Sequence, residues 1–339
     1  NMDFANIISA AGNEFAQNAS DMEETQTYID TGSYTLNAII SGSIYRGLPG
    51  NKVTAYAGEQ ATGKTFFVFE AVKNFLLSKP EGRVLFFETE NALEKGMFDS
   101  RGIDSSRITI FPVATIEEFK SQAVRILDAY LAIKESERPA LLMCLDSLGM
   151  LSTSKEVNDT TAGSDKADFT RPKLIRSAFR VLTLKLGRAN VPLLITNHTY
   201  TSVGSFIPTQ TSAGGGGLKY AASSIVLLSK KQVKEGTEKV GNIVKIKMEK
   251  SRFTKEGSSI ETKIDFERGL DRYHGMIELG LEAGVFQKSG NRILVGESKL
   301  YPKAIYDDPE KYFTKEVLDT IDEYVINRYT YGTTDTVEE

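Results

Sequence analysis

The segment Gly58-Glu-Gln-Ala-Thr-Gly-Lys-Thr65 places the strongest constraint on what this chain can fold into. It matches the pattern G-x-x-x-x-G-K-[ST], follows a strand-like run at 53–56 and precedes a helix-like run that ends before Pro80. Its glycines let the backbone curl so that successive N–H groups face one anion, and the start of the helix adds partial positive charge. The pattern therefore predicts a nucleoside triphosphate site in an α/β domain.

The residues of this loop are all expected to contact the nucleotide. Lys64 is expected to reach the β- and γ-phosphates, and the Thr65 hydroxyl to ligate Mg²⁺. We therefore expect ATP or GTP together with Mg²⁺, since a mere tight turn would not need a Lys-Thr pair after the second glycine. The predicted contact residues are Gly58, Glu59, Gln60, Ala61, Thr62, Gly63, Lys64 and Thr65.

Carboxylates follow two other apolar runs. Asp146 ends the run 141–145, and Glu88 and Glu90 end the run 84–87. Ligands of open α/β sheets bind where the strands end, so Asp146 is predicted to hold the metal and Glu90 to orient an attacking water. A helix cap at Asp146 and a merely salt-bridged Glu90 are the alternatives.

Strand-like and helix-like segments alternate through the first two thirds of the chain. The predicted strands are 53–56, 84–87, 108–111, 141–145 and 193–196, and the predicted helices are 64–79, 92–101, 116–134 and 171–190. This alternation predicts an α/β fold with a mainly parallel, twisted sheet flanked by helices. Runs at 225–228, 243–248 and 259–264 predict further, antiparallel strands.

The two ends of the chain have patterns of their own. Residues 3–19 carry apolar side chains at helical spacing, which predicts an amphipathic helix that packs on its own core or on a neighbouring subunit. Short helical pieces from about residue 275 onward predict a small C-terminal lobe.

Composition excludes several classes of protein. One cysteine rules out a disulfide framework and a Cys-based zinc cluster, and two histidines rule out a multi-histidine metal site. No run approaches the ~18 apolar residues of a membrane span, and the N-terminus lacks a secretion signal. A cytoplasmic protein that does not contact a membrane is expected.

The net charge of −4 conceals an uneven distribution. Residues 1–50 hold six acidic and one basic residue, residues 265–339 hold sixteen and nine, and the middle has a net charge of +8. A basic centre between acidic ends is typical of an anion-binding core, although a mixed, solvated surface is the alternative.

The order of several short segments resembles the RecA family of recombinases, and most closely the UvsX recombinases of tailed phages. The resemblance runs from Tyr34 to about Tyr331. Only the phosphate loop is specific by itself, and the order and spacing of the other segments carry the rest. Those segments are 35–39, 47–50, 86–93, 145–147, 195–198, 214–220 and 248–252.

The resemblance implies roles for five residues. Glu90 would polarise the attacking water, and Asp146 would be the second metal-site acid. His198 would sense the γ-phosphate, where RecA proteins have a glutamine; a structural histidine is the alternative. Lys250 and Arg252, expected on one strand face, would reach the nucleotide of an adjacent subunit, with solvated strand charges as the alternative.

Two polar segments, 152–170 and 199–217, match the DNA-binding loops of the family and are expected to be irregular. The first is not basic in itself, so the DNA contacts are assigned to the helix that follows it. Tyr200 and Phe206 would stack on bases, and the glycine run would act as a hinge. The predicted DNA-binding residues are Lys173, Arg176, Arg180, Tyr200, Phe206, Gly214 and Gly215.

The resemblance implies a RecA-like P-loop ATPase core at 34–274, preceded by a polymerisation helix and linker at 1–33 and followed by a small lobe with an acidic tail at 275–339. The implied function is that of an ATP-dependent recombinase that forms helical filaments on single-stranded DNA and exchanges strands with a homologous duplex. A ring-forming replicative helicase and a non-catalytic ATP-binding mediator are the alternatives.

The implied partners are single-stranded and duplex DNA, further copies of the chain, a single-strand-binding protein and a loading mediator.

Two departures from the family pattern bear on these expectations. Met97 lies where bacterial RecA has an adenine-stacking tyrosine, which puts the mode of base recognition in doubt. The acidic C-terminal tail is shorter than many in the family, which puts an autoinhibitory role in doubt.

Overall fold

The structure is a computed structural model that describes residues 3–22, 27–60, 62–163, 168–201, 210–212, 217–235 and 238–331. The helices in this part of the chain are α1 (Phe4–Ser9), η1 (Ala19–Asp21), α2 (Tyr34–Ser41), α3 (Lys64–Ser78), α4 (Lys95–Asp99), η2 (Ser105–Arg107), α5 (Ile116–Ala132), η3 (Glu135–Glu137), η4 (Leu148–Met150), α6 (Ser154–Thr161), α7 (Arg171–Ala189), α8 (Gly217–Ala221), α9 (Met276–Glu282), α10 (Pro302–Asp307), α11 (Pro309–Tyr312) and α12 (Lys315–Tyr329). The strands are β1 (Tyr28–Ile29), β2 (Leu48–Pro49), β3 (Val53–Gly58), β4 (Arg83–Glu88), β5 (Ile108–Pro112), β6 (Leu141–Asp146), β7 (Leu193–Thr201), β8 (Gln210–Ser212), β9 (Ser224–Glu235), β10 (Glu238–Lys250), β11 (Ser259–Asp265), β12 (Gly269–Leu270), β13 (Gln287–Ser289), β14 (Arg292–Val295) and β15 (Ser298–Leu300).

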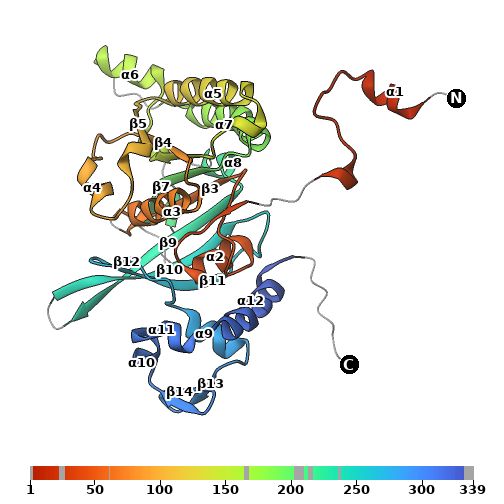
Figure 1. The fold of residues 1–339 in the computed structure, drawn as a ribbon. Coiled ribbons are helices and arrows are strands. Elements are labelled where there is room, and N and C mark those ends of the chain that lie inside the picture. Colours follow the sequence, from red (N-terminus) through yellow and green to blue (C-terminus); the bar gives the residue numbers. More distant parts are fainter. Residues whose placement is uncertain are drawn as a thin grey trace.

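A large sheet forms the centre of the molecule (Figure 1). Its order is β12-β11-β10-β9-β3-β7-β6-β4-β5, and β8 pairs with β7 beside this path. The strands from β9 through β3 to β5 are parallel, whereas β9, β10, β11 and β12 pair antiparallel. The predicted α/β fold with a mainly parallel sheet is therefore confirmed, together with the added antiparallel strands.

Each face of the sheet is covered by its own hydrophobic cluster. Along β6, Met143 and Leu145 belong to the cluster beneath α5 and α7, whereas Leu142 and Cys144 belong to the cluster beneath α2 and α3. Successive side chains of a strand point to opposite faces, so a strand covered on both sides must be apolar throughout. Burial also raises the pKa of the Cys144 thiol, which keeps it in its protonated, unreactive form within the core.

A third cluster lies in the C-terminal lobe, which is drawn in blue in Figure 1. It joins α9, α10 and α12 to a three-stranded antiparallel sheet of β13, β14 and β15. The helical pieces were predicted from the sequence, but this small sheet was not, because its strands have only three or four residues each.

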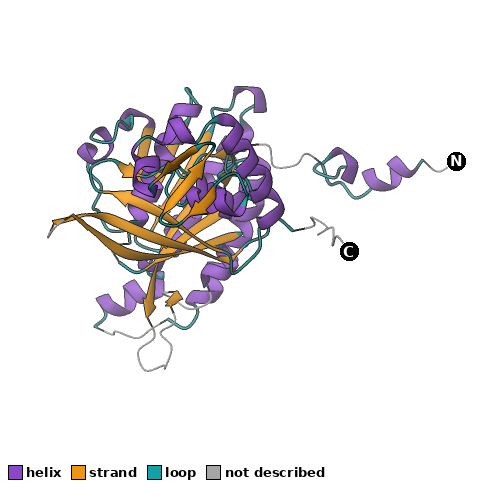
Figure 2. Cartoon of the chain, turned by 90° about the horizontal axis from the view of Figure 1, so that it is seen from below, coloured by secondary structure: helices purple, strands orange, loops and turns teal. Residues whose placement is uncertain are grey.

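The N-terminal helix is shorter than the pattern over residues 3–19 predicted. α1 ends at Ser9, and Gly12 adopts φ +64°, a left-handed conformation that interrupts the helix. None of the α1 side chains is buried, and the segment extends away from the body of the molecule in Figures 1 and 2.

The two segments that were expected to be irregular contain regular structure. The first, 152–170, includes α6, which begins with a capping box between Thr153 and Glu156. In the second, 199–217, β7 continues to Thr201 and pairs with β8. Tyr200 lies in β7, but its side chain, Phe206, Gly214 and Gly215 lie outside the described part of the structure. Base stacking and the glycine hinge therefore stay predictions.

Candidate nucleotide site and basic cleft

The phosphate loop has a backbone that only glycine fits at both ends. β3 ends at Gly58, and α3 begins directly after Gly63. Gly63 has φ +95°, and a Cβ atom there would lie 2.5 Å from Ile264 Cδ1. A Cβ atom on Gly58 would lie 2.7 Å from the main-chain oxygen of Leu228. Gly63, the N-cap residue, has no side chain to occupy the first N–H groups of α3, which leaves them available to an anion.

The other residues of the loop are placed as a phosphate cradle requires. Glu59 and Gln60 are exposed, and Thr62 is buried with its hydroxyl donating to the main-chain oxygen of Glu59 at 2.9 Å. Thr65 is exposed in the first turn of α3, where its hydroxyl is accessible to a ligand. Ala61 lies outside the described residues.

The Lys64 ammonium is held inside this loop. Its Nζ donates to the main-chain oxygens of Gly58 and Glu59, each at 2.8 Å. Burial lowers the pKa of Lys64 to about 8, although the nearby carboxylates of Asp146, Glu90 and Glu59 oppose this shift. A bound phosphate would take the place of these two carbonyl oxygens as the partner of the Lys64 ammonium and would supply a full negative charge. The loop can therefore receive a phosphate.

Asp146 is placed at the carboxyl end of β6, and its carboxylate is oriented by a threonine. Oδ1 accepts a hydrogen bond from Thr196 Oγ1 at 2.6 Å. Burial raises the pKa of Asp146 and the charge of Glu90 adds to this, whereas the bond from Thr196 and the charge of Lys64 oppose it. The hydroxyl of Thr65 and this carboxylate are the oxygen donors that Mg²⁺ prefers, so the residues present fit the predicted metal.

Glu88 and Glu90, the two acids at the end of β4 and just beyond it, lie in different surroundings. Glu88 is buried, and its Oε1 accepts hydrogen bonds from the main-chain N–H groups of Glu90 (3.1 Å) and Ala92 (2.8 Å). It therefore shapes the turn that carries Glu90 instead of facing a ligand. Because β4 ends at Glu88, Glu90 projects beyond the sheet with a half-exposed side chain.

His198 is placed beside the phosphate loop by the pairing of β3 with β7. In that register His198 lies opposite Gly58, the first residue of the loop. Its Nε2 lies 3.8 Å from Glu90 Oε1. The residue expected to contact a terminal phosphate and the residue expected to orient the attacking water are thus adjacent.

Four of the predicted phosphate-contacting cations line a single cleft of about 460 Å³. Arg176 and Arg180 reach it from α7, and Lys250 and Arg252 reach it from the end of β10 and the turn beyond. The remaining lining residues are Phe179, Thr183, Tyr220, Ala221, Ala222 and Ser223. The sequence analysis assigned these cations to two different ligands, and the structure brings them together.

Lys250 and Arg252 differ from the prediction in one respect. β10 ends at Lys250, so the pair does not alternate along a strand face. Lys250 Nζ donates to the main-chain oxygens of Lys219 (2.5 Å) and Ala222 (2.8 Å) and thereby caps the C-terminal end of α8. Burial and the charge of Arg252 lower the pKa of Lys250, while Glu256 opposes the shift.

Arg176 also contacts α8. Its guanidinium lies 3.9 Å from the ring centroid of Tyr220, a cation–π contact. Arg180, one turn further along α7, lines the cleft, whereas Lys173 is exposed one turn before Arg176 and lies outside its lining. The three predicted DNA contacts on α7 therefore share a helix, and two of them share the cleft.

Sequence reasoning missed residues that act by orienting others. Thr196 orients Asp146 from the neighbouring strand, and Arg171 donates to the main-chain oxygens of Leu148, Gly149 and Leu151, which follow Asp146. Arg171, the first residue of α7, is thus engaged within the fold. No sequence pattern marks such contacts, since they depend on the register of β6 with β7 and on the packing of α7.

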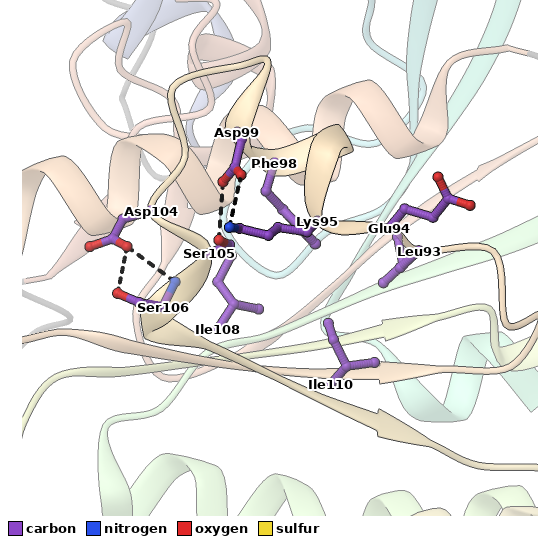
Figure 3. Close-up of a pocket in the computed structure, with 10 residues that line it drawn as sticks. All are labelled: Leu93, Glu94, Lys95, Phe98, Asp99, Asp104, Ser105, Ser106, Ile108 and Ile110. Atoms are coloured by element: carbon purple, nitrogen blue, oxygen red, sulfur yellow. Dashed lines mark hydrogen bonds and ion pairs between the residues drawn. The ribbon is translucent and has the colours of Figure 1, made fainter.

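A separate cavity of about 580 Å³ lies between α4, η2 and the edge strand β5 (Figure 3). Leu93, Phe98 and Ile110 line it, and Ser105 donates to Asp99 at 3.0 Å beside it. No predicted catalytic or phosphate-contacting residue is among the residues that line this cavity. It is therefore distinct from the nucleotide site.

The sheet, the strand–loop–helix turn and the acids at the carboxyl edge define a P-loop nucleoside triphosphatase fold. Residues 7–271 match the family model described as the RecA N-terminal domain, so the chain belongs to the RecA family.

Relatives with a known name agree with this assignment. The chain is 30% identical over 256 residues to the "Recombination and repair protein" of Enterobacteria phage T4, a match that covers 76% of this chain and 64% of the T4 protein. It is 27% identical over 265 residues to "Protein RecA" of Paenarthrobacter aurescens, covering 78% of this chain and 72% of that protein. For "Protein RecA" of Paracoccus denitrificans the identity is 26% over 256 residues, covering 75% and 68%. The resemblance to RecA proteins and their phage relatives is thereby confirmed.

The described helices were also compared with the requirements of a membrane span. None of them combines the length and the apolar character that crossing a bilayer requires.

Proposed function

We propose that this protein is an ATP-dependent recombinase that assembles on single-stranded DNA and exchanges its strand with that of a homologous duplex. The observation that carries the proposal is the cleft in which Arg176 and Arg180 meet Lys250 and Arg252, in the same fold as the phosphate loop. The names of the relatives, a recombination and repair protein and RecA, support it.

ATP with Mg²⁺ would supply the phosphoanhydride bond and the charge neutralisation for its cleavage. Lys64 and the N–H groups at the start of α3 bind the β- and γ-phosphates. Thr65 and Asp146 hold the metal, and Thr196 keeps the Asp146 carboxylate in position.

Glu90 and His198 would divide the remaining work at the γ-phosphate. Glu90 orients the attacking water and accepts its proton, because its carboxylate is exposed at the edge of the sheet. His198 donates a hydrogen bond to the γ-phosphate and transmits its loss to the segment that continues β7.

The cleft gives this ATPase its connection to DNA and to a second subunit. Arg176, Arg180 and Lys173 bind the phosphates of the single strand without reading sequence, so that base pairing decides which duplex is exchanged. Lys250 and Arg252 contact the nucleotide of the adjacent subunit, as an arginine finger does. The nucleotide at each interface would thereby control the grip on DNA.

Head-to-tail assembly is supported by apolar surface at two places. Phe4 is 70% exposed, and Ile7 and Ile8 of α1 are about half exposed. At one end of the sheet order, β5 pairs only with β4 among the strands that the structure describes, and the cavity of Figure 3 lies beside it. We propose that the N-terminal segment of one copy docks on another copy at this edge, a contact that does not close and therefore builds a filament.

The further assignments of the proposal concern organisation and partners. We propose that residues 34–274 form the ATPase core, with the docking segment at 1–33 and the C-terminal lobe at 275–339. A single-strand-binding protein and a loading mediator are the proposed protein partners, and recombination, repair and replication of DNA are the proposed processes, in the cytoplasm of the host cell if a phage encodes the chain.

Electron microscopy with single-stranded DNA and a non-hydrolysable ATP analogue tests the proposal. Continuous helical filaments and a rise in ATP turnover on addition of single-stranded DNA are the expected results. Closed rings would identify a replicative helicase instead. Absence of both assembly and DNA-stimulated turnover would identify an ATP-binding mediator.

A further inference from the structure

One buried carboxylate joins α6, the helix inside the first predicted DNA-binding segment, to α7, the helix that follows this segment. Asp168 is 6% exposed, and its Oδ2 accepts a hydrogen bond from Thr153 Oγ1 at 2.7 Å. Its Oδ1 accepts from the main-chain N–H (2.8 Å) and the hydroxyl (2.5 Å) of Thr170. Thr153 is the N-cap residue of α6 and Thr170 is the N-cap residue of α7, so one side chain fixes the starts of both helices.

The surroundings make this connection part of a rigid frame. The capping box of α6 uses Thr153 a second time, because its hydroxyl oxygen accepts from the N–H of Glu156 at 3.1 Å. Glu117 of α5 accepts from the N–H of Ser154 at 2.5 Å. Arg171, the first residue of α7, donates to the main-chain oxygens that precede the segment. The start of α7 is therefore connected to α6 through Asp168 and to the residues that follow β6 through Arg171.

These contacts explain an oddity of the sequence. The segment 152–170 carries acids where DNA phosphates are expected, although a carboxylate near a phosphate chain repels it. Glu156 and Asp168 are engaged in hydrogen bonds within the frame. Bonds from Thr170 and Thr153 hold the pKa of Asp168 at about 2, so it remains a charged acceptor throughout the physiological range.

We propose that Asp168 is a positioning residue for DNA binding: it fastens the start of α7 to α6, and so fixes where Arg176 and Arg180 meet the DNA backbone without touching DNA itself. This inference rests on the proposed function, in which α7 binds the single strand. The helix is stiff, so an error at its first turn is carried to Arg176 and Arg180, one and two turns further along.

The proposed role of Asp168 predicts that its removal changes DNA affinity in the direction opposite to the one expected from electrostatics alone. If Asp168 acted only as a charge, its removal would strengthen DNA binding. If Asp168 holds the start of α7 in place, removal of its hydrogen bonds weakens DNA binding, although the repulsion of the DNA phosphates is also removed. Asp168→Asn and Asp168→Ala remove the same charge, but the asparagine oxygen still accepts from Thr170 and its amide donates to the Thr153 hydroxyl oxygen.

The experiment measures the affinity of both variants for a fluorescent single-stranded oligonucleotide in the presence of a non-hydrolysable ATP analogue. Asp168→Ala should bind at least about tenfold more weakly than Asp168→Asn, which should bind as tightly as the wild type or more tightly. In steady-state turnover, Asp168→Ala should need more DNA for half-maximal stimulation while reaching the same maximal rate, because the ATPase site itself is unaltered.

Asp159 in α6 supplies a control for charge. Its side chain makes no hydrogen bond or ion pair with any residue that the structure describes, and Asp159→Ala should strengthen DNA binding slightly. Equal affinities of Asp168→Asn and Asp168→Ala would overturn the inference, and so would a binding loss in Asp159→Ala equal to that in Asp168→Ala.

Hydrogen exchange separates failure of this inference from failure of the proposed function. Asp168→Ala, compared with Asp168→Asn, should accelerate amide exchange in the first turns of α6 and α7 in the absence of DNA. A wild-type protein that binds no single-stranded DNA would disprove the proposed function and with it the role in DNA binding. If the wild type binds DNA and exchange is the same in both variants, only the fastening is disproved.

Discussion

His198 Nε2 lies 3.8 Å from Glu90 Oε1, although His198 belongs to β7 and Glu90 follows the end of β4. The pairing of β3 with β7 places His198 opposite Gly58, and the turn shaped by Glu88 brings Glu90 to the same edge. The group that would orient water and the group that would sense the γ-phosphate can therefore respond to one event, the loss of that phosphate.

Glu90→Gln should abolish turnover and preserve binding. The amide keeps the size of the side chain but cannot accept the proton of water, so ATP hydrolysis should fall by about 10²–10⁴-fold. Single-stranded DNA affinity in the presence of ATP should stay at the wild-type level. Steady-state turnover and anisotropy of a labelled oligonucleotide check the two halves, and hydrolysis near the wild-type rate would show that Glu90 is not the catalytic carboxylate.

His198→Gln and His198→Ala should separate sensing from packing. Glutamine could still donate a hydrogen bond to the γ-phosphate, and it is the residue that RecA proteins have at this position. Alanine cannot donate one. The ratio of DNA affinities with the ATP analogue and with ADP should stay large in His198→Gln and fall toward one in His198→Ala. A large ratio in the alanine variant would assign the coupling to another residue.

The positions of the candidate catalytic groups in the fold were predictable because they depend on topology. Asp146 and Glu90 follow apolar runs, Lys64 ends the loop after another such run, and the carboxyl ends of parallel strands meet at one edge of the sheet. The contacts that orient them were not predictable. Thr196 reaches Asp146, and Lys250 reaches the end of α8, only because of strand register and side-chain packing, which leave no periodic trace in the sequence.

Two short elements also differ from the prediction for physical reasons. The pattern over 3–19 has helical spacing, but Gly12 ends the helical conformation soon after Ser9, and none of the α1 side chains is buried against a core that would stabilise a longer helix. The segment 152–170 has too few apolar residues to predict a helix, and α6 is instead stabilised by its capping box and by the bond from Thr153 to Asp168.

Phosphate binding should add a proton to Lys64. The pKa of Lys64 is lowered to about 8 by burial, and the negative charge of a phosphate favours the charged form. At pH 8 about half of these side chains are neutral, so binding should take up as much as about half a proton, and almost none at pH 6. Calorimetric titration with an ATP analogue in two buffers of different ionisation enthalpy measures this uptake.

The sign of the accompanying stability effect follows from the same shift. Between pH 8 and the usual lysine pKa of 10.5 the unfolded chain holds more protons at Lys64 than the folded one, so this residue's contribution to stability rises with pH in that window.

Lys64→Arg is the control for the proton uptake measured by calorimetry, because a guanidinium stays charged and should remove the buffer dependence at pH 8. Equal heats for the wild type in both buffers at pH 8 would contradict the prediction.

The cleft should determine how strongly DNA binding depends on salt. Arg180→Gln removes one predicted phosphate contact, so the slope of log K against log salt concentration should decrease in magnitude by about 0.7 for a single strand. Arg188→Gln is the matched control, because Arg188 belongs to the same helix but packs against the Phe15 ring. Equal slopes for both variants would mean that the cleft does not contact the DNA backbone.

Lys250 and Arg252 should differ in their effect on the free subunit, although both line the cleft. Lys250 caps α8 through the main-chain oxygens of Lys219 and Ala222, so Lys250→Ala should accelerate amide exchange at 217–222 in the absence of nucleotide and DNA. Arg252→Ala should not. Both variants should lose DNA-stimulated ATP turnover, because each lacks a cation that is proposed to contact the nucleotide of the neighbouring subunit. If Lys250→Ala loses turnover without a change in exchange, the cap does not stabilise α8. If Lys250→Ala shows faster amide exchange but normal ATP turnover, Lys250 stabilises only α8, and Arg252 alone contacts the nucleotide across the interface.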